Sequence, residues 1–323
     1  MIKLLSAEES FQRLRAHDPA KRAYAAMYST WLGGIVTDPA VMVIPIDDHG
    51  FHRGDAVFEA VKAVDGRAYA LDRHLERLQT SASHISLKMP FDLKGLHDIC
   101  VETVRASKCR DAILRMYVSR GPGGFTTNPY ETVGSQFYLV ITPFKPMAAA
   151  KYEAGVSAKI SAIKVKDGIF ANVKSCNYLP NVLMKKEALD AGVDFTVSID
   201  EEGYLAEGST ENFAIVDEQG NFVVPGFERT LKGITVFRVM ELAREAGLKA
   251  KEFGEVRHFK ITKDDVFKAR EAFFVGTTLD CIPVTQFEGR AIGGGKPGPV
   301  SHRLNELLRA DMKSGPLVTE IFA

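Results

Sequence analysis

The amino-acid sequence predicts an α+β protein with two domains. Its 323 residues exceed what one small module needs, and 46% hydrophobic with 25% charged residues is the balance of an ordinary globular chain. Patterns typical of strands and helices are interspersed, without the regular strand–helix–strand repeat of a doubly wound sheet. A stretch without periodicity at 143–155 carries two prolines and separates the halves. We therefore expect an N-terminal arm (1–25), a small N-terminal domain (26–145), a linker (146–155) and a large C-terminal domain (156–323).

The first half carries signals for each element in order. Residues 1–25 place Leu5, Phe11 and Leu14 among charges, which favours a short amphipathic helix or arm. Two apolar runs around Gly33-Gly34 indicate a hairpin, and the runs VMVIPI and AVFEAVKAV are typical of strands. Helical spacing of apolar residues follows Asp72, a candidate N-cap. We further expect a helix at 93–107 and strands at AILRMYVS and QFYLVIT.

The second half mixes three expected helices with short strands. The helices are expected at about 179–191, 233–247 and 299–313. Turn clusters such as DEEG and DEQG separate the strands. No repeat of fixed period is visible.

Composition excludes several classes of function. The chain has 41 basic and 41 acidic residues, so no net positive field attracts nucleic acid or an anionic membrane. Four cysteines form no CxxC pair, which indicates reduced thiols rather than a zinc site or a disulfide framework. The N-terminus lacks the apolar core of a signal peptide, and no apolar run approaches 18 residues, so we expect a cytoplasmic protein.

Three apparent ligand motifs fail on inspection. The tract GRAIGGGKPGP has Arg290 and Pro297 where a P-loop needs Gly and Ser or Thr. The loop SRGPGG lacks the spacing of a dinucleotide fingerprint. The histidines form no HExxH or similar pattern, so we expect no metal.

Four segments, read together, resemble the class IV aminotransferases, which are fold type IV enzymes that use pyridoxal 5'-phosphate (PLP). The segments are DDHGFHRGDAVFEAVKAVDGRAYALDRHLERLQTSA, VKSCNYLPNVLMKKEALDAGVDFTVSIDEEGYLAEGSTENFAIV, ERTLKGIT and FFVGTTLDCIPVTQFEGRAIGGGKPGP. Their order and spacing match over roughly residues 28–315. The resemblance implies a two-domain enzyme with PLP at the domain interface. It also implies a homodimer in which loop 119–129 enters the partner's site.

The resemblance assigns the central chemistry to two residues. Lys174, in the apolar and aromatic setting IFANVKSCNYL, stands where the family has the lysine that carries the cofactor and moves the proton. Glu207 in LAEGSTENF stands where the family pairs a carboxylate with the pyridine nitrogen, which keeps the ring an electron sink.

Further cofactor contacts follow from the same resemblance. Arg77 in HLERL, the helix start at Ile234-Thr235 and Thr277 in VGTTLD correspond to the phosphate cradle. Tyr178 resembles a tyrosine that contacts the phenolic oxygen of PLP in branched-chain enzymes, where the spacing from the lysine is one residue longer; packing against the following helix is the alternative.

The residues that select the substrate leave several reactions open. Thr126-Thr127-Asn128 stands where bacterial D-amino-acid aminotransferases have an Arg-x-His carboxylate trap. Phe58, Lys62 and the short KSCN motif nevertheless favour the D-amino-acid side, with an amino donor and a 2-oxo acid acceptor as partners. The alternatives are a branched-chain L-amino-acid or (R)-amine transaminase, or an aminodeoxychorismate lyase. Candidates for contact with the substrate carboxylate are Arg53, Arg115, Thr277 and Thr278.

Overall fold

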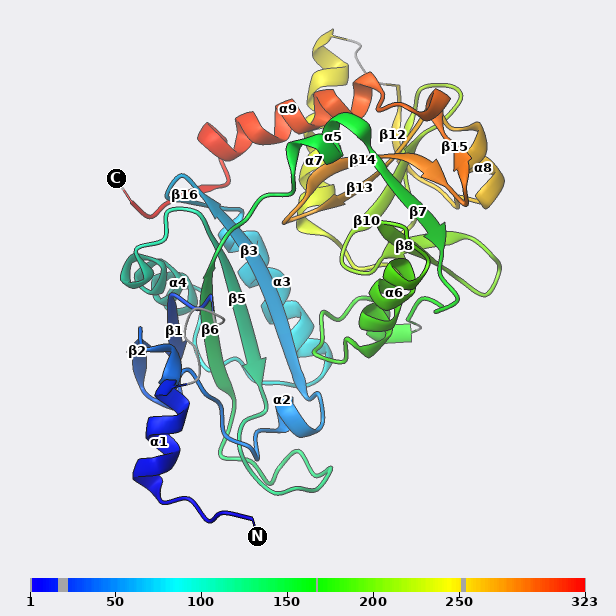
Figure 1. The fold of residues 1–323 in the computed structure, drawn as a ribbon. Coiled ribbons are helices and arrows are strands. Elements are labelled where there is room, and N and C mark those ends of the chain that lie inside the picture. Colours follow the sequence, from blue (N-terminus) through cyan, green and yellow to red (C-terminus); the bar gives the residue numbers. More distant parts are fainter. Residues whose placement is uncertain (1, 17–22, 167, 251–253, 323) are drawn as a thin grey trace. The chain divides into compact units, whose positions relative to one another are not determined.

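The computed structural model of the chain describes residues 2–16, 23–166, 168–250 and 254–322 (Figure 1). It divides into two compact units, the first formed by Met1–Lys145 with Leu317–Ala323 and the second by Pro146–Pro316. Each unit contains its own sheet and its own helices. The predicted α+β class is therefore confirmed.

The first unit is built on a seven-stranded antiparallel sheet in the order β16-β4-β3-β5-β6-β1-β2. The strands are β1 (Ala26–Ser29), β2 (Gly34–Val36), β3 (Ala56–Val64), β4 (Arg67–Tyr69), β5 (Ala112–Ser119), β6 (Gln136–Pro143) and β16 (Val318–Glu320). The hairpin predicted at Gly33-Gly34 is confirmed as β1–β2. The strand β16 comes from the C-terminal tail, which sequence patterns group with the second domain, and it pairs with β4.

The helices of this unit are α1 (Ala7–Ala16), α2 (His49–His52), α3 (Leu71–His84) and α4 (Leu93–Ser107), with a 3-10 turn η2 (Pro39–Val41). Helix α3 packs on β3 and α4 packs on β1, β5 and β6, so the two helices cover the sheet (Figure 1). Helix α3 buries Leu71, Leu75 and Leu78, whose spacing places them on one face. The arm expected at 1–25 contains α1, and its residues 1 and 17–22 lie outside the described residues.

Two local predictions in this unit are wrong. Asp72 is not the N-cap of α3, because the cap is Ala70 in a left-handed conformation (φ 56°) and Asp72 lies in the first turn. The run at 41–46 forms no strand. Its side chains at Val43, Ile44 and Ile46 are exposed, so it has neither the burial nor the paired backbone that would hold a strand.

The second unit is built on a nine-stranded mixed sheet in the order β12-β11-β10-β13-β14-β7-β8-β9, with β15 beside β14. The strands are β7 (Val156–Ile160), β8 (Phe195–Ile199), β9 (Leu205–Gly208), β10 (Asn212–Val216), β11 (Phe222–Val224), β12 (Val256–His258), β13 (Glu271–Gly276), β14 (Asp280–Phe287) and β15 (Arg290–Ala291). Because β9 also pairs with β10, six strands close into a ring. Phe213, Phe274 and Phe287 belong to the buried core of this unit.

Five helices accompany this sheet within the described residues. They are α5 (Ala149–Ala154), α6 (Leu179–Asp190), α7 (Ile234–Ala250), α8 (Lys263–Lys268) and α9 (Pro299–Ser314), with 3-10 turns η3 (Gly168–Ala171) and η4 (Gly293–Gly295). The three helices predicted from periodicity are confirmed as α6, α7 and α9. Helix α5 occupies most of the stretch expected to be a linker.

Candidate active site

Lys174 and Tyr178 meet in the irregular segment between η3 and α6. The Nζ of Lys174 donates a hydrogen bond of 3.3 Å to the Tyr178 hydroxyl and lies 5.5 Å from the centroid of its ring. Tyr178 is the N-cap residue of α6, and a proline stands in the first turn, where its missing N–H costs nothing. The start of the helix thus sets the position of the tyrosine against the lysine amine.

Glu207 points its carboxylate from β9 at the segment before α7. Its Oε2 accepts a 3.0 Å bond from the Leu231 amide, while its main-chain oxygen accepts one from the Ser198 hydroxyl. Burial raises the pKa of Glu207 to about 7, although the Leu231 amide, Lys174 and Lys166 all act to lower it. Such a carboxyl group is poised to lose its proton when a cation lies against it.

A hydroxyl pair lies at the start of α7. Thr235 is buried in the first turn of the helix, and its Oγ1 lies 3.4 Å from the Oγ1 of Thr277, which follows β13. The first-turn amides of a helix have no partners within it and favour an anion. Ile234 opens the helix, and Thr278 beside Thr277 is exposed.

Asn212 brings Glu207 and the hydroxyl pair to one place. It pairs with Glu207 across β9 and β10 and with Val275 across β10 and β13, two residues before Thr277. Its side-chain amide donates to the Leu231 carbonyl, three residues before α7. The sequence-predicted residues of the second unit therefore converge on the ends of three adjacent strands.

Arg77, in the first unit, is held by a buried carboxylate. Its Nε and Nη2 donate to the two oxygens of Glu59 at 2.6 and 2.9 Å, and His74 Nδ1 lies 2.7 Å from Oε2 of Glu59. Glu59 is completely buried. Burial acts to raise its pKa, but the charges of Arg77 and His74 and their hydrogen bonds hold it well below the usual range. Glu59 and His74 thus fix the direction of the guanidinium.

Phe58, Lys62 and Arg115 lie together on the other face of the same sheet. Phe58 pairs with Tyr117, Lys62 with Ile113 and Ala60 with Arg115, so these side chains point away from Glu59. The Phe58 ring stacks on Tyr117 at 6.1 Å, the buried Lys62 lies over the Phe144 ring, and Arg115 donates to Thr142. The structure brings these three predicted residues together, separate from Arg77.

Arg53 has a different environment from the one its sequence position suggests. Its guanidinium donates to the main-chain oxygens of His52, Phe125 and Thr126. It therefore anchors the loop that follows β5.

With this geometry in place, the family model for amino-transferase class IV matches residues 56–287. The matched span includes Lys174, Glu207 and Thr277. The chain belongs to the class IV aminotransferases.

Relatives of this aminotransferase carry two kinds of name. The chain is 38% identical to the chloroplastic D-amino-acid transaminase of Arabidopsis thaliana, over 98% of this chain and 83% of that protein. It is 32% identical to a putative branched-chain-amino-acid aminotransferase of Methanocaldococcus jannaschii, over 85% and 93%. A solved branched-chain amino acid aminotransferase with pyridoxamine 5'-phosphate, from the organism abbreviated T.th., superposes with a TM-score of 0.85 at 26% identity, covering 93% of this chain and 99% of that one.

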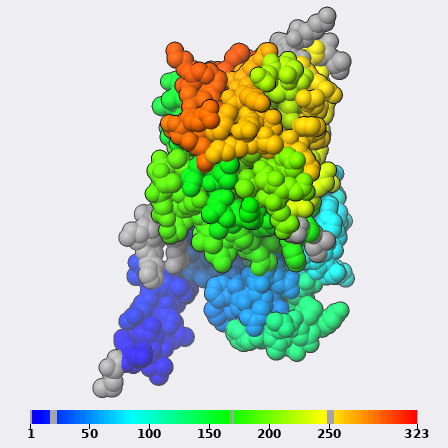
Figure 2. Space-filling view, turned by 90° about the vertical axis from the view of Figure 1, so that its right-hand side faces the viewer, coloured from blue at the N-terminus to red at the C-terminus, as the bar shows by residue number. Residues whose placement is uncertain are grey.

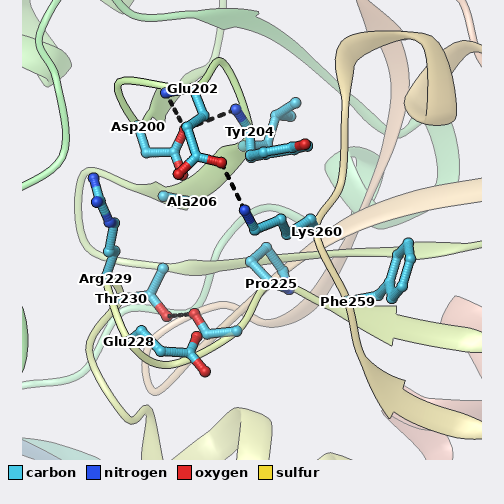
Figure 3. Close-up of a pocket in the computed structure, with 12 residues that line it drawn as sticks. Asp200, Glu202, Tyr204, Ala206, Pro225, Glu228, Arg229, Thr230, Phe259 and Lys260 are labelled. Carbon is cyan, nitrogen blue, oxygen red and sulfur yellow. Dashed lines mark hydrogen bonds and ion pairs between the residues drawn. The ribbon is translucent and has the colours of Figure 1, made fainter.

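A separate pocket of about 160 Å³ in the second unit of the aminotransferase contains none of the predicted site residues (Figure 3). Its charged groups satisfy one another: Glu202 pairs with Lys260 at 2.7 Å, and Asp200 accepts from the amides of Glu202 and Tyr204. Lys260 also lies over the Tyr204 ring. These contacts brace the turn between β8 and β9, which supports the strand that carries Glu207.

Sequence patterns missed Lys166, Leu231, Glu59 and His74. Leu231 acts through its backbone amide, for which no side-chain motif exists. Glu59 left a trace, because it is the acidic residue inside the apolar run AVFEAVKAV. Among the residues that the structure describes, no three or more of His, Cys, Asp and Glu could hold a metal, and no helix could span a membrane.

Proposed function

We propose that this aminotransferase binds PLP through Lys174 and moves an amino group from a D-amino acid to a 2-oxo acid. One observation carries the proposal: a lysine amine bonded to a tyrosine hydroxyl lies within electrostatic reach of a buried carboxyl group, all within one unit. A primary amine, a carboxylate for a pyridine nitrogen and an anion site are the three groups that hold PLP.

The described residues fit the cofactor at both of its ends. The carboxyl group of Glu207, whose pKa burial raises to about 7, gains a partner in a protonated pyridine nitrogen. The hydroxyls of Thr235 and Thr277, 3.4 Å apart at the start of α7, supply donors for a phosphate, as do the first-turn amides. We further propose that Arg77 contributes its fork of donors to the same phosphate.

The chemistry that PLP supplies when bound is an electron-accepting ring and a carbon that holds the amino group between half-reactions. Lys174 then acts as the base and acid that moves the proton of the substrate Cα. Glu207 keeps a positive charge on the ring nitrogen, and the Tyr178 hydroxyl orients the lysine amine. In the first half-reaction the donor leaves as a 2-oxo acid, and in the second a different 2-oxo acid leaves as an amino acid.

Two features favour D-amino acids as donors. The relative named D-amino-acid transaminase matches 98% of the chain. Four residues separate Lys174 from Tyr178, one fewer than in the branched-chain pattern. The second candidate is a branched-chain L-amino-acid transaminase, favoured by the named relative at 32% identity and by the contact of Tyr178 with the lysine amine.

A donor panel separates these candidates. Purified protein loaded with PLP is mixed with D-alanine, L-alanine, D-leucine, L-leucine or a chiral amine, with no acceptor, and the loss of the cofactor's visible band is followed. We expect D-alanine to react at least tenfold faster than L-leucine. Faster reaction with L-leucine would establish the branched-chain alternative, and catalytic release of pyruvate from aminodeoxychorismate would establish the lyase.

We also propose that the enzyme is a homodimer. Loop 119–133 is held at its base by Arg53 and carries exposed apolar side chains, with Phe125 62%, Tyr130 92% and Val133 69% exposed. The segment lies at the surface in Figure 2, where it is blue-green. Exposed apolar groups clustered on one ordered loop are typical of an association surface.

A further inference from the structure

A second lysine, Lys166, lies beside the residues of the proposed cofactor site. It comes from the segment between β7 and η3, and its Nζ lies 4.8 Å from the centroid of the Tyr178 ring. Lys174 Nζ lies 5.5 Å from the same centroid. Two lysine amines therefore approach one aromatic ring, and the catalytic scheme above uses only one of them.

The charges around this pair are few. Glu207 interacts with both lysines. Glu211 lies behind Glu207 and is buried, with its oxygens bound to Thr210. Lys232 lies next to Leu231 and is exposed. The other titratable group facing the pair, among the residues that the structure describes, is the Tyr178 hydroxyl.

Lys166 has two sources of stabilisation for its positive charge. Burial lowers its pKa, and Glu207 acts in the opposite direction. The electron-rich face of Tyr178 adds a cation–π contact that partly offsets the lost hydration. The ammonium is thus held in a site of low polarity, where charges act on one another more strongly than in water.

A cation at this position favours one charge state of its neighbours. Transamination needs Glu207 ionised, so that it can hold a protonated ring nitrogen, and needs Lys174 uncharged, so that it can take a proton. A nearby positive charge stabilises the carboxylate and destabilises a second ammonium, and adjacent cations are a known means of activating lysine nucleophiles.

We propose that Lys166 is a positioning residue that acts through Lys174 and Glu207, its ammonium favouring the ionised carboxylate and the uncharged amine. The inference rests on the proposed function for its catalytic meaning, but its electrostatic part belongs to the protein alone.

The test uses the whole chain without and with PLP. In the first arm, ¹³C-carboxyl glutamate is incorporated, the Glu207 signal is assigned with Glu207→Gln, and its titration is followed by NMR without cofactor. We expect Lys166→Met to raise the titration midpoint by about one pH unit, a tenfold change in proton affinity. Lys166→Arg should restore the wild-type midpoint. Lys164→Met, an exposed lysine two residues away, is the matched control and should leave it unchanged.

In the second arm the acid limb of the pH–rate profile is measured with PLP bound. Lys166→Met should move this limb to higher pH, and Lys166→Arg should not. Unchanged midpoints and limbs in Lys166→Met would overturn the inference, and Lys166→Gln replaces it if the methionine variant does not fold. A wild-type protein that neither binds PLP nor transaminates would refute the proposed function instead, while the NMR titration would still decide the role of Lys166.

Discussion

Burial raises the pKa of Glu207 to about 7, compared with about 4.5 for a glutamate in an unfolded chain. Between these values the folded protein binds a proton that the unfolded chain releases. The carboxyl group therefore reduces the free energy of unfolding as pH rises through this window. The site keeps an unfavourable ionised group because a cofactor cation relieves it.

Glu207→Gln should consequently stabilise the protein without cofactor at pH 8, by roughly 1–3 kcal/mol. Urea unfolding at pH 8 and pH 4 measures the effect. The gain should vanish at pH 4, where both side chains are uncharged, and the same variant should bind PLP more weakly. Equal gains at both pH values would contradict the electrostatic origin.

Glu59 has the opposite energetics, since its charge is compensated by Arg77 and His74. Glu59→Gln leaves a buried guanidinium without its counter-charge, and we expect a loss of about 3 kcal/mol in the free energy of unfolding. Urea unfolding checks it, with Glu76→Gln, an exposed glutamate of α3, as the control that should change little. A loss no larger than that of the control would show that the pair does not position Arg77.

Motif spacing identified Lys174 and Glu207 because their roles require particular side chains. It could not identify Leu231, whose contribution is a backbone N–H, or Lys166, one of 41 basic residues with no distinguishing pattern. These two depend on how the chain folds back on itself.

At the scale of elements, the start of α7 depends on a close approach that only glycine permits. A Cβ on Gly233 would collide with Oδ1 of Asn212, the residue whose amide holds Leu231. Leu231 in turn donates to Glu207. A side chain at Gly233 would therefore disturb both ends of the proposed cofactor site.

We predict that Gly233→Ala weakens PLP binding at least tenfold and costs roughly 1–3 kcal/mol of stability. Cofactor titration by absorbance and urea unfolding measure the two effects. Gly34→Ala, where nothing lies within 4 Å of the added carbon, should leave both unchanged. Wild-type affinity in Gly233→Ala would mean that the helix start does not form part of the site.

Helices with clear apolar periodicity, such as α4 and α9, were predictable to within a residue or two. The run at 41–46 was not, because β-branched residues indicate a strand only when a neighbouring strand pairs with them. The short α2 and α8 have too few residues for periodicity to be visible.

At the scale of the whole molecule, zero net charge is compatible with binding an anionic cofactor. A phosphate needs local donors, and the start of α7 with Thr277 supplies them without shifting the balance of 41 basic and 41 acidic residues. The tail could not be placed from patterns, because β16 pairs with β4, which lies far earlier in the chain.

The proposed dimer yields a prediction at this scale. Replacing Phe125 and Tyr130 by Asp should convert the dimer to a monomer, because charged groups would be buried in the interface. Light scattering coupled to size-exclusion chromatography measures the mass, with Phe259→Asp, 64% exposed in the other unit, as the control. A wild-type mass near the 35.5 kDa of one chain would contradict the dimer.

The central claim is that Lys174 carries PLP while Lys166 beside it does not. The direct measurement is to load the protein with PLP, reduce it with sodium borohydride and locate the pyridoxyl group by peptide mass spectrometry. The account predicts one pyridoxyl group per chain, on Lys174, and none in Lys174→Ala. A pyridoxyl group on Lys166 or on another lysine of the wild-type protein, or no covalent label, would contradict it.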